Sequence, residues 1–150
     1  RRAGTENVAG IAGFGAAVKA VSGVGDPAWR DAAARRLKAA GAVVFGEDAP
    51  RLANTLCVAA PGWDAERQVM ALDLAGVMVS AGSACSSGKV KASHVLTAMG
   101  AGDLAGCAIR VSGGWDTTEA DWNTFTAAWV EVHARHSARR PSASSLGQVA

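Results

Sequence analysis

The 150-residue sequence contains no run of 18 apolar residues, because glycine, serine or a charged residue interrupts every apolar stretch. That absence excludes a membrane-spanning helix within the sequence. The sequence also lacks an excess of either charge: 15 Lys and Arg residues against 13 Asp and Glu residues give a formal net charge of +2. Arg135, Arg139 and Arg140 follow the last acidic residue, Glu131, and the rest of the chain carries about −1. The weak basicity therefore provides no argument for nucleic-acid binding.

Cysteine is rare as well. The three cysteines, Cys57, Cys85 and Cys107, are an odd number, and the first residues show no signal-peptide pattern. We therefore expect free thiols in a reducing compartment, the cytoplasm, rather than a disulfide framework. Hydrophobic residues make up 49% of the chain, which is typical of a folded domain and excludes wholesale disorder. The sequence opens on Arg1 without methionine, so we expect it to be part of a longer polypeptide.

Hydrophobic spacing and turn residues predict helices that alternate with short strands. The predicted helices span residues 6–20, 26–40, 64–76, 93–99 and 118 to about 134, and the predicted strands span 42–45, 54–60, 77–80 and 107–112. This alternation indicates an α/β fold, of the α+β small-domain type, with helices packed on one face of a small sheet. From about residue 135 onward, the Ser, Arg, Pro and Gly content predicts a disordered tail.

Capping residues mark where several of these helices begin. We expect Thr5 to cap the first helix, and Asp26 followed by Pro27 to open the second. Thr118 with Asp121 forms a capping-box pattern before the last helix. Four apolar residues then share one face of that helix: Trp122, Phe125, Trp129 and Val132. Three glycines lower the helix propensity of residues 6–20, so we expect that helix to pack closely against another element.

The stretch SAGSACSSGK, residues 80–89, is small and polar, and we predict a loop there from Ala81 onward. No bulky neighbour buries the thiol of Cys85, and Lys89 can lower its pKa toward the reactive thiolate. A mobile loop of this kind can carry a nucleophile to a substrate that is held elsewhere. The alternative is an unreactive cysteine in a solvent-exposed loop.

The other cysteines and the histidines do not show metal-ligand spacing. Cys57 and Cys107 lie in apolar strand contexts, and we predict that both are buried core thiols. His94, His133 and His136 have no partner in the sequence pattern, and we expect the last two to be solvated. No metal site is predicted.

Arg110 and Thr5 are further candidate site residues. Strict alternation in Ala108–Ser112 places Arg110 and Ser112 on the face of the strand opposite Ile109 and Val111. A guanidinium in the middle of a strand suits two-point binding of a carboxylate, or alternatively an ion pair with a local Asp or Glu. Thr5, at a helix start, can contribute to an anion site, although a plain helix cap is the commoner role.

Four segments together resemble the cysteine desulfurases of the class V aminotransferase family. The opening residues RRAGTENVAGI resemble the segment that follows the cofactor site in that family. SAGSACSSGK, SHVLTAMG, and IRVS followed by WDTT resemble its C-terminal signature, in the same order. The resemblance extends from residue 1 to about residue 133, and its cysteine loop is the most specific part.

The resemblance implies a homodimeric enzyme of pyridoxal-phosphate fold type I, with this chain as its C-terminal part. Residues 1–25 would then be the end of the large cofactor domain and a linking helix, residues 26–134 the small domain, and residues 135–150 a tail. By the same resemblance, Cys85 attacks the sulfur of L-cysteine, keeps it as a persulfide and releases alanine. Arg110 holds the substrate carboxylate, and Thr5 touches the pyridoxal 5′-phosphate, at the partner subunit's site.

The serine–glycine form of the loop resembles the group of desulfurases that delivers sulfur to iron–sulfur scaffold proteins and tRNA-thiolation factors. In this family a histidine precedes the lysine that binds the cofactor. Neither Lys19 nor Lys38 has that context, so we expect the cofactor lysine upstream of residue 1 and no desulfurase activity in this chain alone.

Three alternatives stay open. The first is a selenocysteine lyase or another enzyme of the class V family. A chain that stands alone would instead be a non-enzymatic sulfur carrier or interaction module, which keeps the thiol without the cofactor. A truncated remnant without activity is the last alternative, and its uncovered apolar faces predict poor solubility.

Overall fold

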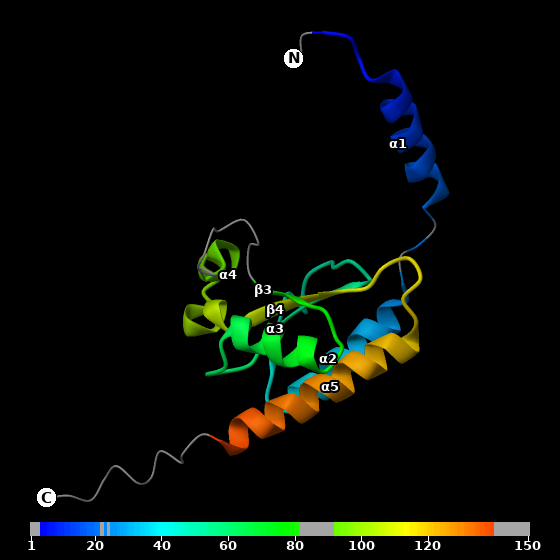
Figure 1. Cartoon of the computed structure of the whole chain (residues 1–150). Coiled ribbons are helices and arrows are strands. Elements are labelled where there is room, and N and C mark those ends of the chain that lie inside the picture. The colour runs from blue at the N-terminus through cyan, green and yellow to red at the C-terminus, as the bar shows by residue number, and fades with distance from the viewer. Residues whose placement is uncertain (1–3, 22, 24, 82–91, 140–150) are drawn as a thin grey trace, which may run out of the picture.

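A small antiparallel sheet organises the fold in the computed structural model, which describes residues 4–21, 23, 25–81 and 92–139 (Figure 1). The strands are β1 (Val43–Phe45), β2 (Thr55–Ala59), β3 (Ser80–Ala81) and β4 (Ala108–Ser112). Their order in the sheet is β1-β2-β4-β3, and every neighbouring pair is antiparallel. This arrangement confirms the α/β fold class with a small sheet.

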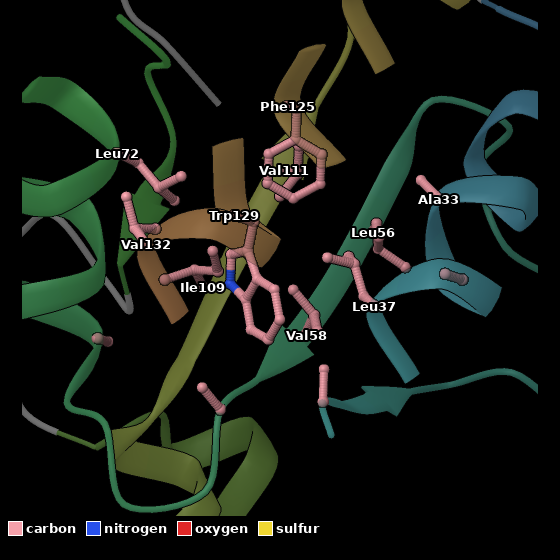
Figure 2. Close-up of a cluster of buried hydrophobic side chains, with 14 of the residues drawn as sticks. Ala33, Leu37, Leu56, Val58, Leu72, Ile109, Val111, Phe125, Trp129 and Val132 are labelled. Atoms are coloured by element: carbon pink, nitrogen blue, oxygen red, sulfur yellow. The ribbon is translucent and has the colours of Figure 1, made fainter. Parts of the chain in front are cut away.

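Helices α2 (Pro27–Ala39), α3 (Ala65–Leu74) and α5 (Glu119–Ala138) lie on the same face of the sheet and enclose the main core (Figure 1). Figure 2 shows the Trp129 ring among Leu37, Val58 and Ile109, which come from a helix and two strands. Each fully buried side chain of this size contributes about 1.5–3 kcal/mol relative to exposure. The prediction of helices on one face of the sheet is therefore confirmed.

Helix α5 begins as the capping box predicts. The Thr118 side chain accepts from the Asp121 backbone N–H, and the Asp121 carboxylate accepts from the Thr118 backbone N–H at 2.8 Å. Trp122, Phe125 and Trp129 are all buried, and so is Val132 one turn later. The predicted tail boundary at residue 135 is wrong, because the helix continues to Ala138; residues 140–150 lie outside the described part of the chain.

Two histidines explain part of this extension. The His133 ring stacks on Trp129 with 4.6 Å between centroids, and the His136 ring stacks on Trp63 at 4.8 Å. Both histidines are half-buried, so the expectation that they are solvated is wrong. Burial, assisted by the charge of His136, lowers the pKa of His133 below its ordinary value. These contacts stabilise the last turns of α5.

One buried polar residue ties the helices to the sheet. The Gln68 side chain, on α3, is fully buried and donates to the carbonyl oxygens of Trp63 at 2.8 Å and Cys107 at 2.6 Å. Its oxygen accepts from Trp129 Nε1 at 3.2 Å. Because a buried amide needs all its partners, this network fixes the position of α3 against β4 and α5.

The opposite face of the sheet is only partly covered. Helix α4 (His94–Ala98) and the 3₁₀ helix η1 (Gly102–Gly106) pack over Ala59 and Ala108 in a second, smaller apolar cluster. Ser93 caps α4 by accepting from the Leu96 backbone N–H. Strand β3 contains only Ser80 and Ala81, so the strand predicted over residues 77–80 is too long and begins too early. Val77 and Val79 still pack on the main core, which explains the apolar pattern that suggested a strand.

Helix α1 (Val8–Ala20) has no buried residue and stands apart from the other elements (Figure 1). Asn7, not Thr5, caps it: the Asn7 side chain accepts from the Gly10 backbone N–H at 3.0 Å. The prediction that Thr5 caps this helix is therefore wrong. The expected close packing of α1 is also not found within the described residues, and its apolar side chains, such as Phe14 at 74% exposure, face solvent. In contrast, Asp26 caps α2 as predicted. No helix of the described chain has the length and apolar character to cross a bilayer.

Candidate functional site

A row of directly opposed residues crosses the less covered face of the sheet. Phe45 pairs with Cys57, Cys57 pairs with Arg110, and Arg110 pairs with Ser80. Directly opposed residues in neighbouring strands share one face, so this row points away from the core that contains Ile109 and Val111.

Beside this row lies a cavity of about 420 Å³, which we call the Arg110 cavity. Its lining comes from the row, from α4 and from the connection between β1 and β2: Phe45, Gly46, Ala49, Pro50, Arg51, Leu52, Thr55, Cys57, Ser93, Val95, Leu96, Met99, Ala108, Ile109 and Arg110. A mostly apolar cavity of this size with a few convergent polar groups is the usual form of a small-molecule site.

Arg110 provides an exposed guanidinium to this cavity. Within the described residues no carboxylate lies within ion-pair distance of it, whereas several other arginines of the domain are paired. The alternative of a local acidic partner therefore has no support in the described part of the chain. A guanidinium that is left free in this way can bind the carboxylate of a ligand at two points.

Cys57 lies directly across from Arg110 and lines the same cavity. It is half-buried and packs at the margin of the second apolar cluster, so the prediction that Cys57 is buried is wrong, whereas Cys107 is buried as predicted. Burial raises the pKa of the Cys57 thiol, and the positive charge of Arg110 acts in the opposite direction. The neutral thiol therefore predominates at this position near neutral pH.

Arg51 is a cavity residue that the sequence analysis did not identify. Its Nη2 lies 3.4 Å from Asp31 Oδ1, and the same oxygen lies 2.8 Å from Nη2 of the buried Arg30. Arg30 Nη1 also donates to the Leu52 carbonyl oxygen at 2.5 Å. These contacts fasten the β1–β2 connection, which forms one wall of the cavity, to helix α2. No sequence signal marks Arg51, because its role depends on how the connection folds back on α2.

Cys85 lies outside the described residues, in the segment 82–91. The described residues on either side of this segment border the cavity region: Ser80 pairs with Arg110, and Ser93 lines the cavity. Described residues on both sides of the Cys85 segment thus lie beside the Arg110 cavity. Thr5 is exposed and precedes α1, which stands apart from the other elements, so the structure does not bring Thr5 to this cavity (Figure 1).

The residues of the cavity do not fit pyridoxal phosphate as a covalently held group. Among the described residues that line it there is no lysine to supply the amine for a Schiff base. The described residues also contain no cluster of His, Cys, Asp and Glu side chains that would hold a metal ion. The cavity is therefore suited to a carboxylate-bearing small molecule, and a cofactor needs residues from elsewhere.

Comparison with known proteins gives a consistent result. The family model described as aminotransferase class V matches residues 1–125. The chain is 38% identical over 145 residues to a putative cysteine desulfurase of Bacillus subtilis, covering 90% of this chain and 38% of that protein. It is 37% identical over 142 residues to a cysteine desulfurase of Rhodobacter capsulatus, covering 89% of this chain and 37% of that protein.

Among solved structures, a NifS-like protein from Rickettsia africae matches with a TM-score of 0.69 and 30% sequence identity. That match covers 89% of this chain and 36% of the other. The chain thus spans between 27% and 38% of the length of the first curated relatives that it matches.

Proposed function

Because the chain belongs to the aminotransferase class V family, we propose that it is the C-terminal part of a cysteine desulfurase, which removes sulfur from L-cysteine and leaves L-alanine. The observation that supports this most directly is the position of Arg110. It is an exposed arginine without an acidic partner among the described residues, it lines a cavity of ligand size, and it is paired with the strand that leads into the Cys85 segment.

Arg110 binds the carboxylate of the substrate in this proposal. Its guanidinium offers two parallel N–H donors to the two carboxylate oxygens, which fixes the orientation of the amino acid as well as its position. The ring of Phe45 and the aliphatic part of α4 limit the space around the bound molecule. A small amino acid therefore suits the site better than a peptide.

Cys85 is the proposed sulfur acceptor. Its thiolate forms a bond to the substrate sulfur while the carbon–sulfur bond of cysteine breaks, and the electron pair of that bond stays with the carbon, which takes up a proton to give alanine. The sulfur remains on Cys85 as a persulfide. Pyridoxal phosphate, as the proposed cofactor of the whole enzyme, supplies the electron sink that such a bond cleavage requires. Thr5 is proposed as a contact of its phosphate.

Burial supports a proposed division of the chain. The elements from residue 26 to the end of α5 at Ala138 share their own apolar core, and we propose that they are the small domain, with residues 1–25 as the end of the large cofactor domain. The exposed apolar residues of α1 support this division, because they require cover from parts of the enzyme outside the described residues. A homodimer, an iron–sulfur scaffold or tRNA-thiolation protein as sulfur acceptor, and a location in the reducing cytoplasm complete the proposal.

The test uses the complete polypeptide that carries these residues. It is incubated with L-cysteine, alanine is measured, and the persulfide is mapped by mass spectrometry on tryptic peptides. Each cysteine lies in its own peptide, with Cys57 in residues 52–67, Cys85 in residues 68–89 and Cys107 in residues 92–110. We expect the extra sulfur on residues 68–89.

Matched variants make the outcome decisive. Cys85→Ala abolishes alanine formation in this proposal, whereas Cys107→Ala, which removes a thiol buried beneath α4 and η1, leaves it in place. Sulfur on Cys57 or Cys107, with Cys85→Ala fully active, would contradict the proposal. Faster turnover of selenocysteine than of cysteine would instead identify a selenocysteine lyase. Sulfur uptake by Cys85 from an external donor, without alanine formation, would identify a non-enzymatic carrier.

A further inference from the structure

Besides Arg110, the Arg110 cavity contains a thiol that the proposed desulfurase reaction does not use. Cys57 is a free thiol directly opposite Arg110 in the β2–β4 pairing, and both residues line the cavity. The Cβ atoms of directly opposed residues in an antiparallel pair lie about 4.5–5.5 Å apart. The charge of Arg110 also acts on the Cys57 thiol, so an anion bound to Arg110 lies in the surroundings of this sulfur.

We propose that Cys57 is a modification site, at which carboxylate-bearing disulfides such as cystine form a mixed disulfide under the guidance of Arg110. This inference rests on the proposed function only in that Arg110 binds carboxylates; it does not depend on turnover or on Cys85. The resulting adduct fills the Arg110 cavity and blocks the carboxylate site until a thiol reductant removes it.

The reaction is an ordinary thiol–disulfide exchange. The Cys57 thiol loses its proton, and the thiolate attacks one sulfur of the disulfide. A new sulfur–sulfur bond forms to Cys57 as the old one breaks, and the other half of the disulfide leaves as a thiolate that takes up the proton. The incoming disulfide is the oxidant, so no further electron acceptor is needed.

Charge selectivity follows from the environment of the thiol. Because burial raises the pKa of Cys57, little thiolate is present near neutral pH, and intrinsic reactivity alone gives a slow reaction. Arg110 compensates by raising the local concentration of anionic reagents and by orienting their carboxylates. A disulfide without a negative charge lacks this advantage. The site is thus expected to distinguish disulfides by charge rather than by their general reactivity.

The access to the cavity supports the same selectivity. Most of its lining is apolar, so a reagent that enters must leave water, and only one that pairs with Arg110 recovers the lost hydration of its charge. Arg51 also lines the cavity, but it is paired with Asp31, so its charge is largely compensated. No Asp or Glu side chain is part of the lining within the described residues, and a cationic disulfide therefore meets the charge of Arg110 without an attractive partner.

The experiment compares two aromatic disulfides on the complete polypeptide: dithiobis(nitrobenzoate), which carries two carboxylates, and dithiodipyridine, which carries none. Modification of Cys57 is followed over time by mass spectrometry of the peptide 52–67, which contains this cysteine alone. Arg110→Gln is compared with Arg135→Gln, an equal change of charge at an exposed position of α5 that leaves the Arg110 cavity and the peptide 52–67 intact.

We expect Arg110→Gln to slow modification of Cys57 by the anionic reagent about tenfold, the effect of losing one charge-assisted contact, and to leave the neutral reagent almost unaffected. Arg135→Gln and Arg110→Lys, which retain a positive charge in the cavity, keep the preference for the anionic reagent. Cystine is then expected to add one cysteinyl group, about 119 Da, to the peptide 52–67. The peptide that contains Cys107 is expected to stay unmodified.

Two results would overturn the inference: an unmodified Cys57, or equal modification by both reagents that Arg110→Gln does not change. Either result leaves the proposed function intact, because that function is measured separately as persulfide on Cys85. Conversely, absence of persulfide together with charge-selective labelling of Cys57 would reject the desulfurase and retain this site.

Discussion

The domain contains two arginines whose surroundings predict opposite consequences of the same substitution. Arg110 is exposed, and no described residue forms an ion pair with it, whereas Arg30 is only 6% exposed and is bonded to Asp31 and to the Leu52 carbonyl oxygen. Arg110→Gln leaves no buried group without its partner, so we expect its free energy of unfolding to change by less than about 0.5 kcal/mol. Arg30→Gln removes the shorter of two contacts at each acceptor: the Leu52 carbonyl keeps only the Thr55 backbone N–H at 3.4 Å, and Asp31 keeps only Arg51 at 3.4 Å.

The magnitudes follow from these contacts. A hydrogen bond to a charged group contributes about 1.5–3 kcal/mol, so Arg110→Gln is expected to raise KM for L-cysteine by roughly 10- to 150-fold. For Arg30→Gln we expect a loss of about 2–3 kcal/mol in the free energy of unfolding, because Asp31 is partly exposed and regains some hydration. Its KM stays close to that of the unmodified enzyme wherever the protein remains folded.

The assay pairs steady-state kinetics of the complete polypeptide with urea unfolding followed by tryptophan fluorescence. Arg110→Lys serves as the conservative control, because a point charge retains part of the attraction without the two-point geometry. Its KM is expected to lie between those of the unmodified enzyme and Arg110→Gln. An Arg110→Gln enzyme with an unchanged KM would refute the carboxylate site. A loss of stability as large as that of Arg30→Gln would show that Arg110 has a structural partner.

Three further predictions concern the stability of the same domain, each measured by urea unfolding of the complete polypeptide. Gln68→Ala removes the partners of the Trp63 carbonyl and of Trp129 Nε1, and we expect a loss of about 2–4 kcal/mol; a loss below about 1 kcal/mol would contradict the network. Thr118→Ala removes the cap of α5 and is expected to cost about 1 kcal/mol, whereas Thr118→Ser retains most of it. His133 has a lowered pKa in the folded state, so the unfolded state binds the proton more readily, and stability falls as the pH drops through the ordinary histidine pKa of about 6.5. His133→Phe keeps the stacking on Trp129 and should weaken this pH dependence; an unchanged profile would show that another group causes it.

Local signals in the sequence determined most of the helices. The Asp26–Pro27 pair and the capping box of Thr118 and Asp121 begin α2 and α5, because each satisfies backbone donors within a few residues. Gly41 and Gly100 follow the ends of α2 and α4 with φ of +93° and +79°, a conformation that glycine adopts without strain. Such interactions involve neighbours in the chain, so sequence alone is sufficient to predict them. The same holds for the alternation that separates Arg110 from Ile109.

Competing local signals were harder to separate. Thr5 and Asn7 are both good capping residues two positions apart, and the helix begins at the second of them. The apolar residues before β3 pack on the core without forming strand hydrogen bonds, so an apolar pattern there does not predict a strand. Helix α5 continues past the predicted boundary because His136 stacks on a tryptophan from another part of the chain.

Only the tertiary structure decided the composition of the site. The pairing of β2 with β4 places Cys57 opposite Arg110, although 52 other residues lie between them in the sequence, and a shift of one residue would turn Cys57 into the core. Arg51 reaches the cavity because Asp31 holds it against α2. Strand register and long-range ion pairs depend on which distant segments meet, and that choice is made by burial of the whole core. The sequence by itself therefore determined the family and the candidate Arg110, and the tertiary packing determined that Cys57 and Arg51 share a cavity with it.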